Sequence, residues 1–130
     1  MRDQKVAFFV DDDADFLGLI PASIQHPHFE VRTYCAENGY RIVDEVIKTK
    51  PDVLFIDFTL PRANAGQILP ILRSVQRFSN LPVYFITGFP RAEILPFVEA
   101  LDYKGILAKG DTFKTEVLKI LDALDRTVSI

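Results

Sequence analysis

The chain has 130 residues, of which 48% are hydrophobic, so it can bury the core of one domain without disulfides or a structural metal. Its net charge of −3 provides no basic field for holding nucleic acid, so we expect no direct binding to DNA or RNA. The single cysteine cannot form an internal disulfide, and the first apolar run is too short for a secretory signal or a membrane span. We therefore expect a single cytoplasmic domain over residues 1–130, with no membrane partner.

Short apolar runs rich in Val, Ile and Phe predict strands that are buried on both faces. These runs span Val6–Val10, Val53–Ile56, Val83–Ile86 and Ile106–Ala108. A further segment, Phe29–Tyr34, alternates apolar and polar residues instead. That alternation is typical of an edge strand with one face more exposed.

The segments between these runs carry apolar residues at helical spacing. The clearest stripes are Ile42, Val43, Val46 and Ile47, then Ile68, Leu69, Leu72 and Val75, then Val117, Leu118, Leu121 and Leu124. Pro21, Pro70 and Pro96 fall inside segments predicted to be helical, so we expect those helices to begin late or to kink. The repeated alternation of strand and helix predicts an α/β fold, with a parallel sheet covered by helices on both faces.

Polar side chains follow the predicted strands. Asp11 and Asp12 end the first run, Asp57 follows the third strand, Thr87 the fourth, and Lys109 the fifth. Because the carboxyl ends of parallel strands meet at one edge of a sheet, we expect these side chains to converge. Crowded carboxylates favour a divalent ion with oxygen ligands, Mg²⁺ or Mn²⁺, and the ammonium and hydroxyl suit a tetrahedral anion such as a phosphoryl group.

With these motifs the chain resembles the receiver domains of response regulators in two-component regulatory systems. The segments VDDD, DVLFIDFTLP, PVYFITG and GILAKG occur in the family's order and near its usual separations, and the similarity covers essentially the whole chain. The resemblance implies a flavodoxin-like (βα)5 fold, a three-layer sandwich around a five-stranded parallel sheet of order 2-1-3-4-5.

The resemblance also implies a role for each residue at the strand ends. Asp57 matches the residue that accepts a phosphoryl group from a histidine kinase or phosphotransfer protein. Asp11, Asp12 and the backbone carbonyl of Thr59 match the groups that hold Mg²⁺ together with Asp57. Thr87 and Lys109 match the side chains that contact the phosphoryl group.

Phosphorylation in this family favours one of two pre-existing surface states, which an output protein or domain reads. The usual output face is formed by the fourth and fifth helices and the fifth strand. Thr59 and Phe89 match positions that tune the lifetime of the phosphoryl group. The resemblance thus implies a signalling module rather than an enzyme, although such a module assists its own phosphorylation and dephosphorylation. The sequence leaves the kinase, the output partner and homodimer formation open.

The chain departs from the family's pattern at three places. Gly66 follows the acceptor by nine residues rather than eight, so the loop beside the site is one residue longer. Gly110 follows Lys109 where the family usually has proline after a cis bond, and a cis bond before glycine would cost roughly 2.5–4 kcal/mol, so we expect trans. Ile106 stands where the family often has an aromatic residue, and Tyr103 does not take its place in the sequence.

Asp13 comes one residue after the acidic pair, where a carboxylate can cap the first helix. This interpretation depends on register, since a shift of one residue would make Asp12 and Asp13 the metal pair. His26 and His28 could hold a metal, but their spacing around Pro27 favours a turn before the second strand. Cys35 is expected to be a small, partly buried residue.

Three other functions compete with this interpretation. An EF-hand is excluded, because Phe16 and Ala22 stand where that loop needs glycine and glutamate. A haloacid-dehalogenase-like phosphatase would carry its nucleophile on the first strand in an Asp-x-Asp-x-Thr/Val pattern. This chain has Asp11-x-Asp13-x-Asp15 there, which does not match. A degenerate receiver that binds partners without phosphorylation is the closer alternative, given Gly110 and Ile106.

Overall fold

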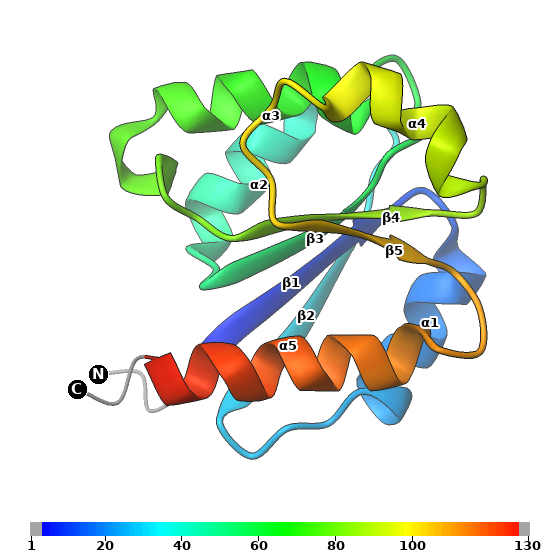
Figure 1. The fold of residues 1–130 in the computed structure, drawn as a ribbon. Coiled ribbons are helices and arrows are strands. Elements are labelled where there is room, and N and C mark those ends of the chain that lie inside the picture. Colours follow the sequence, from blue (N-terminus) through cyan, green and yellow to red (C-terminus); the bar gives the residue numbers. More distant parts are fainter. Residues whose placement is uncertain (1–3, 128–130) are drawn as a thin grey trace.

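Figure 1 shows the computed structural model, which describes residues 4–127 as alternating strands and helices. The strands are β1 (Lys5–Asp11), β2 (Phe29–Cys35), β3 (Val53–Asp57), β4 (Val83–Thr87) and β5 (Gly105–Ala108). The helices are α1 (Ala14–Ser23), α2 (Ile42–Thr49), α3 (Ala65–Ser74), α4 (Arg91–Val98) and α5 (Phe113–Thr127), with 3-10 turns η1 (Gly39–Arg41) and η2 (Gln76–Phe78). Every predicted strand is present, and no strand end moves by more than one residue.

The five strands form one parallel sheet in the order β2-β1-β3-β4-β5, which confirms the predicted flavodoxin-like topology. Helices α2, α3 and α4 cover one face, and α1 and α5 cover the other (Figure 1). The edge strand β2 is more exposed than β1 and β3, as its alternating sequence predicted. No helix among residues 4–127 combines the length and the apolar character needed to cross a bilayer.

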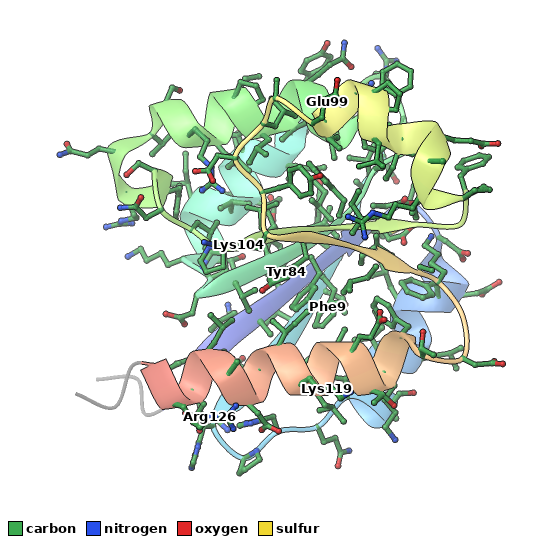
Figure 2. The ribbon with its side chains drawn as sticks, in the orientation of Figure 1. Phe9, Tyr84, Glu99, Lys104, Lys119 and Arg126 are labelled. Atoms are coloured by element: carbon green, nitrogen blue, oxygen red, sulfur yellow. The ribbon has the colours of Figure 1, made fainter. Side chains whose placement is uncertain are left out.

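Alternate residues of the central strands supply the two halves of the core. Phe8 and Val10 face α2 to α4, whereas Ala7 and Phe9 face α1 and α5. The ring of Phe9 stacks on that of Phe55, with centroids 4.6 Å apart and planes at 7°. Figure 2 shows Phe9 between the sheet and α5. Because these strands are buried on both faces, they read as continuous apolar runs in the sequence.

Of the two alternatives expected for the proline-containing helices, the late start is wrong, and the kink stays a prediction. Pro21, Pro70 and Pro96 each lie beyond the first turn of α1, α3 and α4. Each proline therefore removes one backbone donor from the interior of a helix. Packing of the apolar face against the sheet holds these helices in place despite that loss.

Two smaller predictions also fail. The second apolar stripe, which begins at Ile68, extends to Val75, but α3 ends at Ser74 and Val75 is extended, with φ −83° and ψ 114°. Cys35 is exposed rather than partly buried, because it ends the edge strand β2. Helical spacing thus predicted the position of α3 but not its last residue. Residue size did not predict the exposure of Cys35.

Candidate functional site

The carboxyl ends of the parallel strands bring the predicted polar residues to one edge of the sheet. Asp11 ends β1, Asp57 ends β3, Thr87 ends β4, and Lys109 directly follows β5. Strand β3 lies between β1 and β4, so Asp57 has Asp11 at the end of β1 on one side and Thr87 at the end of β4 on the other. The predicted convergence of these residues is confirmed.

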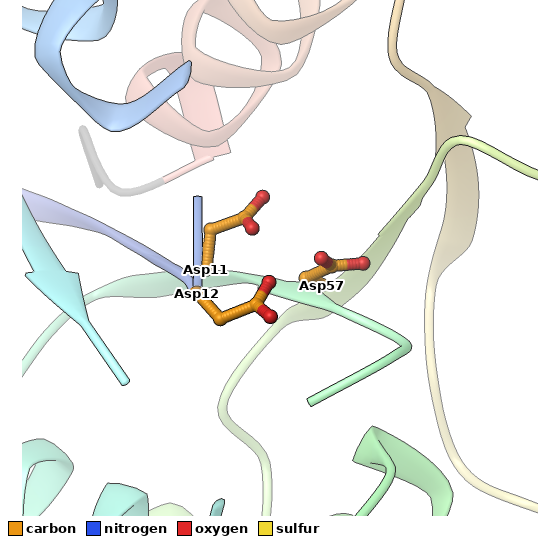
Figure 3. Close-up of side chains that lie close together, drawn as sticks. All are labelled: Asp11, Asp12 and Asp57. Carbon is orange, nitrogen blue, oxygen red and sulfur yellow. The ribbon is translucent and has the colours of Figure 1, made fainter. Parts of the chain in front are cut away.

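Asp11, Asp12 and Asp57 form what we call the acidic cluster. Each offers a carboxylate oxygen within 4.8 Å of the others. Figure 3 shows the three side chains close together at the ends of the strands. Asp11 is 0% exposed and Asp57 only 6%, whereas Asp12 is exposed, so the cluster is buried on one side and open on the other.

Lys109 is the cation that faces this cluster. Its Nζ lies 2.7 Å from Oδ2 of Asp11 and 3.3 Å from Oδ2 of Asp57. The contact with Asp11 is an ion pair, since the buried Oδ2 atom makes no hydrogen bond of good geometry. One ammonium therefore serves two buried carboxylates, and neither is fully compensated.

This crowding raises the pKa of Asp57 to about 7. Burial contributes most, the hydrogen bond and charge of Asp11 add to it, and Lys109 opposes both. Burial also raises the pKa of Asp12, with Asp11 contributing in the same direction. For Lys109, burial lowers the pKa, but the two carboxylates outweigh burial and raise it. The site thus holds more negative charge than one lysine balances.

Backbone amides orient the buried carboxylates. The amide of Thr59 donates to Oδ1 of Asp57 over 3.3 Å, and the amide of Asp13 donates to Oδ1 of Asp11 over 3.0 Å. Each carboxylate therefore has one oxygen held by the main chain and its other oxygen directed at Lys109. Thr59 itself is exposed at the open side of the site.

Asp13 has a different role, and the predicted helix cap is confirmed. Its Oδ1 accepts from the amides of Asp15 at 3.0 Å and Phe16 at 3.1 Å, which caps the first turn of α1. Its carboxylate is not part of the acidic cluster. Asp11 and Asp12, and not Asp13, are thus the two aspartates that lie with Asp57.

Thr87 is buried at 2% exposure, and its hydroxyl oxygen accepts a hydrogen bond of 2.9 Å from the amide of Phe89. The side chain of Phe89 is 54% exposed. Both residues thus lie at the edge that carries the acidic cluster, with Thr87 inside and Phe89 at the surface.

The donor set of the acidic cluster fits a small divalent cation. All three ligands are carboxylates, which suit Mg²⁺ or Mn²⁺ rather than zinc. Asp11 Oδ2 is buried without a hydrogen bond, and its ion pair with Lys109 is shared with Asp57, so positive charge is in short supply at the site. Asp11, Asp12 and Asp57 are therefore the residues that could hold such an ion.

The loops around the site accommodate the departures from the family's pattern. No peptide bond among residues 4–127 is cis, so Lys109–Gly110 is trans as predicted. The longer loop after β3 contains Arg62 in a left-handed conformation, with φ 70°, and ends in a reciprocal cap between Asn64 and Gln67. A Cβ on Gly66 would come within 3.3 Å of the carbonyl oxygen of Phe97, so α3 and α4 approach closely there.

Comparison with known proteins identifies the family. The response regulator receiver domain matches residues 7–120. The chain belongs to the response-regulator receiver family. As a receiver domain it resembles the chemotaxis response regulator CheY4 of Vibrio cholerae, with a TM-score of 0.77 at 21% identity over 93% of this chain and 98% of CheY4. The response regulator domain of Thermotoga maritima CheB gives a TM-score of 0.73 at 19% identity, covering 98% of each chain.

Curated relatives of this receiver domain are longer proteins. Protein RcaC of Microchaete diplosiphon is 28% identical over 90 residues, which are 67% of this chain and 14% of RcaC. A protein-glutamate methylesterase/protein-glutamine glutaminase of Pyrococcus abyssi is 29% identical over 107 residues, which are 79% of this chain and 27% of the relative. The receiver domain thus spans between a seventh and about a quarter of the length of these relatives.

Sequence reasoning missed one residue of this receiver site. The ring of Phe16, in the first turn of α1, lies beneath Lys109, with Nζ 4.6 Å from the ring centroid. An aromatic residue one helical turn after the acidic pair was the available signal. Ile106, which stands at the family's usual aromatic position, and Tyr103 both pack against the core beneath α2 to α4. The ring centroid of Tyr103 lies 5.1 Å from that of Phe85.

Proposed function

We propose that Asp57 of this receiver domain accepts a phosphoryl group from a histidine kinase or a phosphotransfer protein in a Mg²⁺-dependent reaction. The observation that carries this proposal is the position of Asp57: a buried carboxylate beside two other aspartates, with Oδ2 only 3.3 Å from an ammonium. A carboxylate in such a position can attack phosphorus, because a positive charge nearby can stabilise the oxygens of the transferred group.

The residues of the chain have distinct parts in this proposal. An oxygen of Asp57 forms the new bond to phosphorus while the bond from phosphorus to the donor's histidine nitrogen breaks. Lys109 moves its ammonium toward the incoming oxygens. Asp11, Asp12, Asp57 and the carbonyl of Thr59 would hold Mg²⁺, which would supply positive charge for the oxygens of the phosphoryl group. Hydrolysis of the resulting acyl phosphate regenerates the free carboxylate of Asp57.

Thr87 supplies the conformational response in this proposal. Its hydroxyl oxygen now accepts from the amide of Phe89. To donate to a phosphoryl oxygen, the hydroxyl must turn toward Asp57 on the neighbouring strand. Such a rotation frees the amide of Phe89 and shifts the loop between β4 and α4. Phe89 and Thr59, both at the exposed side of the site, are then placed to influence the attack of water on the phosphoryl group.

The output partner in this proposal binds the face formed by α4, β5 and α5. The same face could serve for a homodimer of the domain over residues 1–130. The proposed module is cytoplasmic, and its binding is switched by the state of Asp57 rather than by chemistry on the partner.

The test is incubation of the domain with Mg²⁺ and acetyl phosphate, followed by intact mass measurement. We expect the wild type to gain the mass of one phosphoryl group and Asp57→Asn to gain none. Asp122→Asn, the same chemical change on an exposed residue of α5, is the matched control and should behave as wild type. A folded, Mg²⁺-binding wild type that forms no adduct with acetyl phosphate or a kinase would instead favour a receiver that works unphosphorylated.

A further inference from the structure

The aromatic ring under Lys109 connects the acidic cluster to a second part of the molecule. Phe16 presents its ring to the ammonium at 4.6 Å, within the range of a cation–π interaction. The lysine side chain is 23% exposed, so water screens this contact only in part. Lys109 is thus held by three groups: Asp11, Asp57 and the ring of Phe16.

Phe16 also contacts the helix that follows Lys109 in the chain. Its ring centroid lies 5.3 Å from that of Phe113, the first residue of α5. Phe113 in turn lies 6.5 Å from Phe9, in an edge-to-face arrangement within the core. The ring of Phe16 is therefore one link between the charged site and the packing of α5 on the sheet.

The same two rings line a pocket of about 200 Å³ between α1 and the start of α5. The other lining residues are Leu19, Ile20, Ser23, Ile24, Gly110 and Lys114. A shift of either ring changes the shape of this pocket, and its wall includes Leu19, which is 68% exposed. The pocket is thus a surface whose form depends on the position of Phe16.

Phosphorylation of Asp57 would disturb the balance at Lys109. A phosphoryl group adds negative charge next to Asp57 Oδ2, which is already 3.3 Å from Nζ. The ammonium is drawn toward that charge and away from the ring, since its attraction to an anion exceeds its attraction to an aromatic face. The ring of Phe16 then loses the cation that orders it.

We propose that Phe16 positions Lys109 for phosphoryl transfer and passes the movement of Lys109 on to Phe113 and the pocket between α1 and α5. This inference rests on the proposed phosphorylation of Asp57. It gives the domain an aromatic response on the α1 and α5 side of the sheet, whereas Ile106 lies against the opposite core.

The first test uses the wild type alone and does not need phosphorylation. Protons next to Nζ that lie over an aromatic face shift upfield in the NMR spectrum. We expect the ε-methylene protons of Lys109 to show this shift, and Phe16→Leu, which keeps an apolar side chain without a ring, to abolish it. Phe16→Tyr, which keeps the aromatic ring, should show the same upfield shift as the wild type. An unshifted Lys109 signal in the wild type would overturn the assignment of Phe16.

The second test measures adduct formation on Asp57 with Mg²⁺ and acetyl phosphate. We expect Phe16→Leu to slow it by about 3- to 10-fold, Phe16→Tyr to stay within about 2-fold of wild type, and the Lys109 and Phe113 signals of the wild type to move together on phosphorylation. Tyr40→Leu, which removes an exposed aromatic ring from η1, is the matched control and should keep the wild-type rate. Equal rates in all variants, or a Phe113 signal that does not move, would overturn the inference.

The two tests separate failure of the inference from failure of the proposed function. If the wild type forms no adduct but its Lys109 signal is shifted by the ring, the phosphoryl function fails and so does the coupling built on it, while the contact itself stands. If the adduct forms and Phe16→Leu matches the wild type in rate and spectrum, the phosphoryl function stands and Phe16 has no positioning role.

Discussion

Two charged clusters at opposite ends of the sheet differ in how their charges are balanced. At the carboxyl ends of the strands, the acidic cluster sets three carboxylates against one ammonium. At the amino ends, a second group pairs each carboxylate with basic partners of its own. We call it the histidine cluster, and its members are Lys5, His26, His28, Asp122 and Asp125.

The histidine cluster joins the loop before β2 to the last turns of α5. Nε2 of His26 lies 2.8 Å from Asp122, and Nδ1 of His28 lies 2.7 Å from Asp125, whose other oxygen is 3.0 Å from Lys5. The turn predicted at His26-Pro27-His28 is confirmed by the backbone hydrogen bond from the amide of Phe29 to the carbonyl oxygen of His26, at 3.3 Å. These histidines serve as partners of aspartates on α5.

The charges of the histidine cluster are paired with one another, whereas the acidic cluster holds negative charge in excess of its one basic partner. Paired groups near the surface cost little to keep, and each contributes little. Buried carboxylates without sufficient counter-charge cost stability, so their presence points to a ligand that supplies the missing positive charge. Substitutions in the two clusters should therefore have opposite consequences.

The largest expected effect is on metal binding at the acidic cluster. Asp11→Ala and Asp12→Ala should each weaken Mg²⁺ binding by at least about 10- to 100-fold, because each removes a charged ligand. Asp13→Ala, the neighbouring aspartate that only caps α1, should bind Mg²⁺ as the wild type does. Isothermal titration calorimetry would measure the three affinities. Loss of binding in Asp13→Ala but not in Asp11→Ala would show that the wrong pair was assigned.

Removing the charge of Asp57 should stabilise the metal-free domain. Its pKa is raised to about 7 in the fold from an ordinary value of 3.8, so the folded state binds the extra proton and loses stability as pH rises from about 4 through 7. Asp57→Asn should therefore be more stable than wild type by about 1–2 kcal/mol at pH 8, after allowance for screening by solvent and Lys109.

Denaturant unfolding in EDTA at pH 4 and pH 8 checks this expectation. The two proteins should be close to equal at pH 4 and separate at pH 8. Adding Mg²⁺ at pH 8 should stabilise the wild type and leave Asp57→Asn less affected, since the cation supplies the counter-charge. A variant that is less stable than wild type at pH 8 without metal would contradict the view that charge is in excess here.

A smaller loss is expected from the cap of α1. Asp13→Ala removes the acceptor for the amides of Asp15 and Phe16 and should lower the free energy of unfolding by about 1 kcal/mol. Asp13→Asn keeps an acceptor oxygen and should recover most of that loss. Urea unfolding measures both variants, and an Asn variant as unstable as the Ala variant would argue that the cap is not what matters.

The smallest effect is expected in the histidine cluster. Hydrogen bonds from His28 and Lys5 lower the pKa of Asp125 to about 2, so its stabilising contribution is present above about pH 4 and is lost as pH falls through 2. Asp125→Asn should lower the melting temperature slightly at pH 5.5, less so in high salt, and not at pH 2. A loss of stability larger than that of Asp13→Ala would contradict the interpretation that the paired charges of the histidine cluster each contribute little.

Much of the fold and of the acidic cluster could be predicted because both depend on local patterns. Strands buried on both faces leave continuous apolar runs, and parallel topology brings the residues after them to one edge. The end of α3 could not be predicted, because helical spacing continues to Val75 while the chain turns away.

Contacts between distant segments were beyond the reach of the sequence. The pairing of His26 with Asp122 joins residues 96 positions apart, and no local pattern relates them. The position of the Phe16 ring under Lys109 depends on the direction of α1 relative to β5 and on one side-chain rotamer. Such contacts follow from packing, which is settled only when the helices dock on the sheet.

The prolines within α1, α3 and α4 have a consequence for the order in which the domain assembles. A proline in a helix interior costs roughly 3 kcal/mol relative to alanine, so these three segments form helix poorly by themselves. Helix α5 has fifteen residues and no proline, and β1 and β3 share the stacked rings of Phe9 and Phe55. We expect the folding nucleus to contain β1, β3 and α5, with the proline-bearing helices closing over it afterwards.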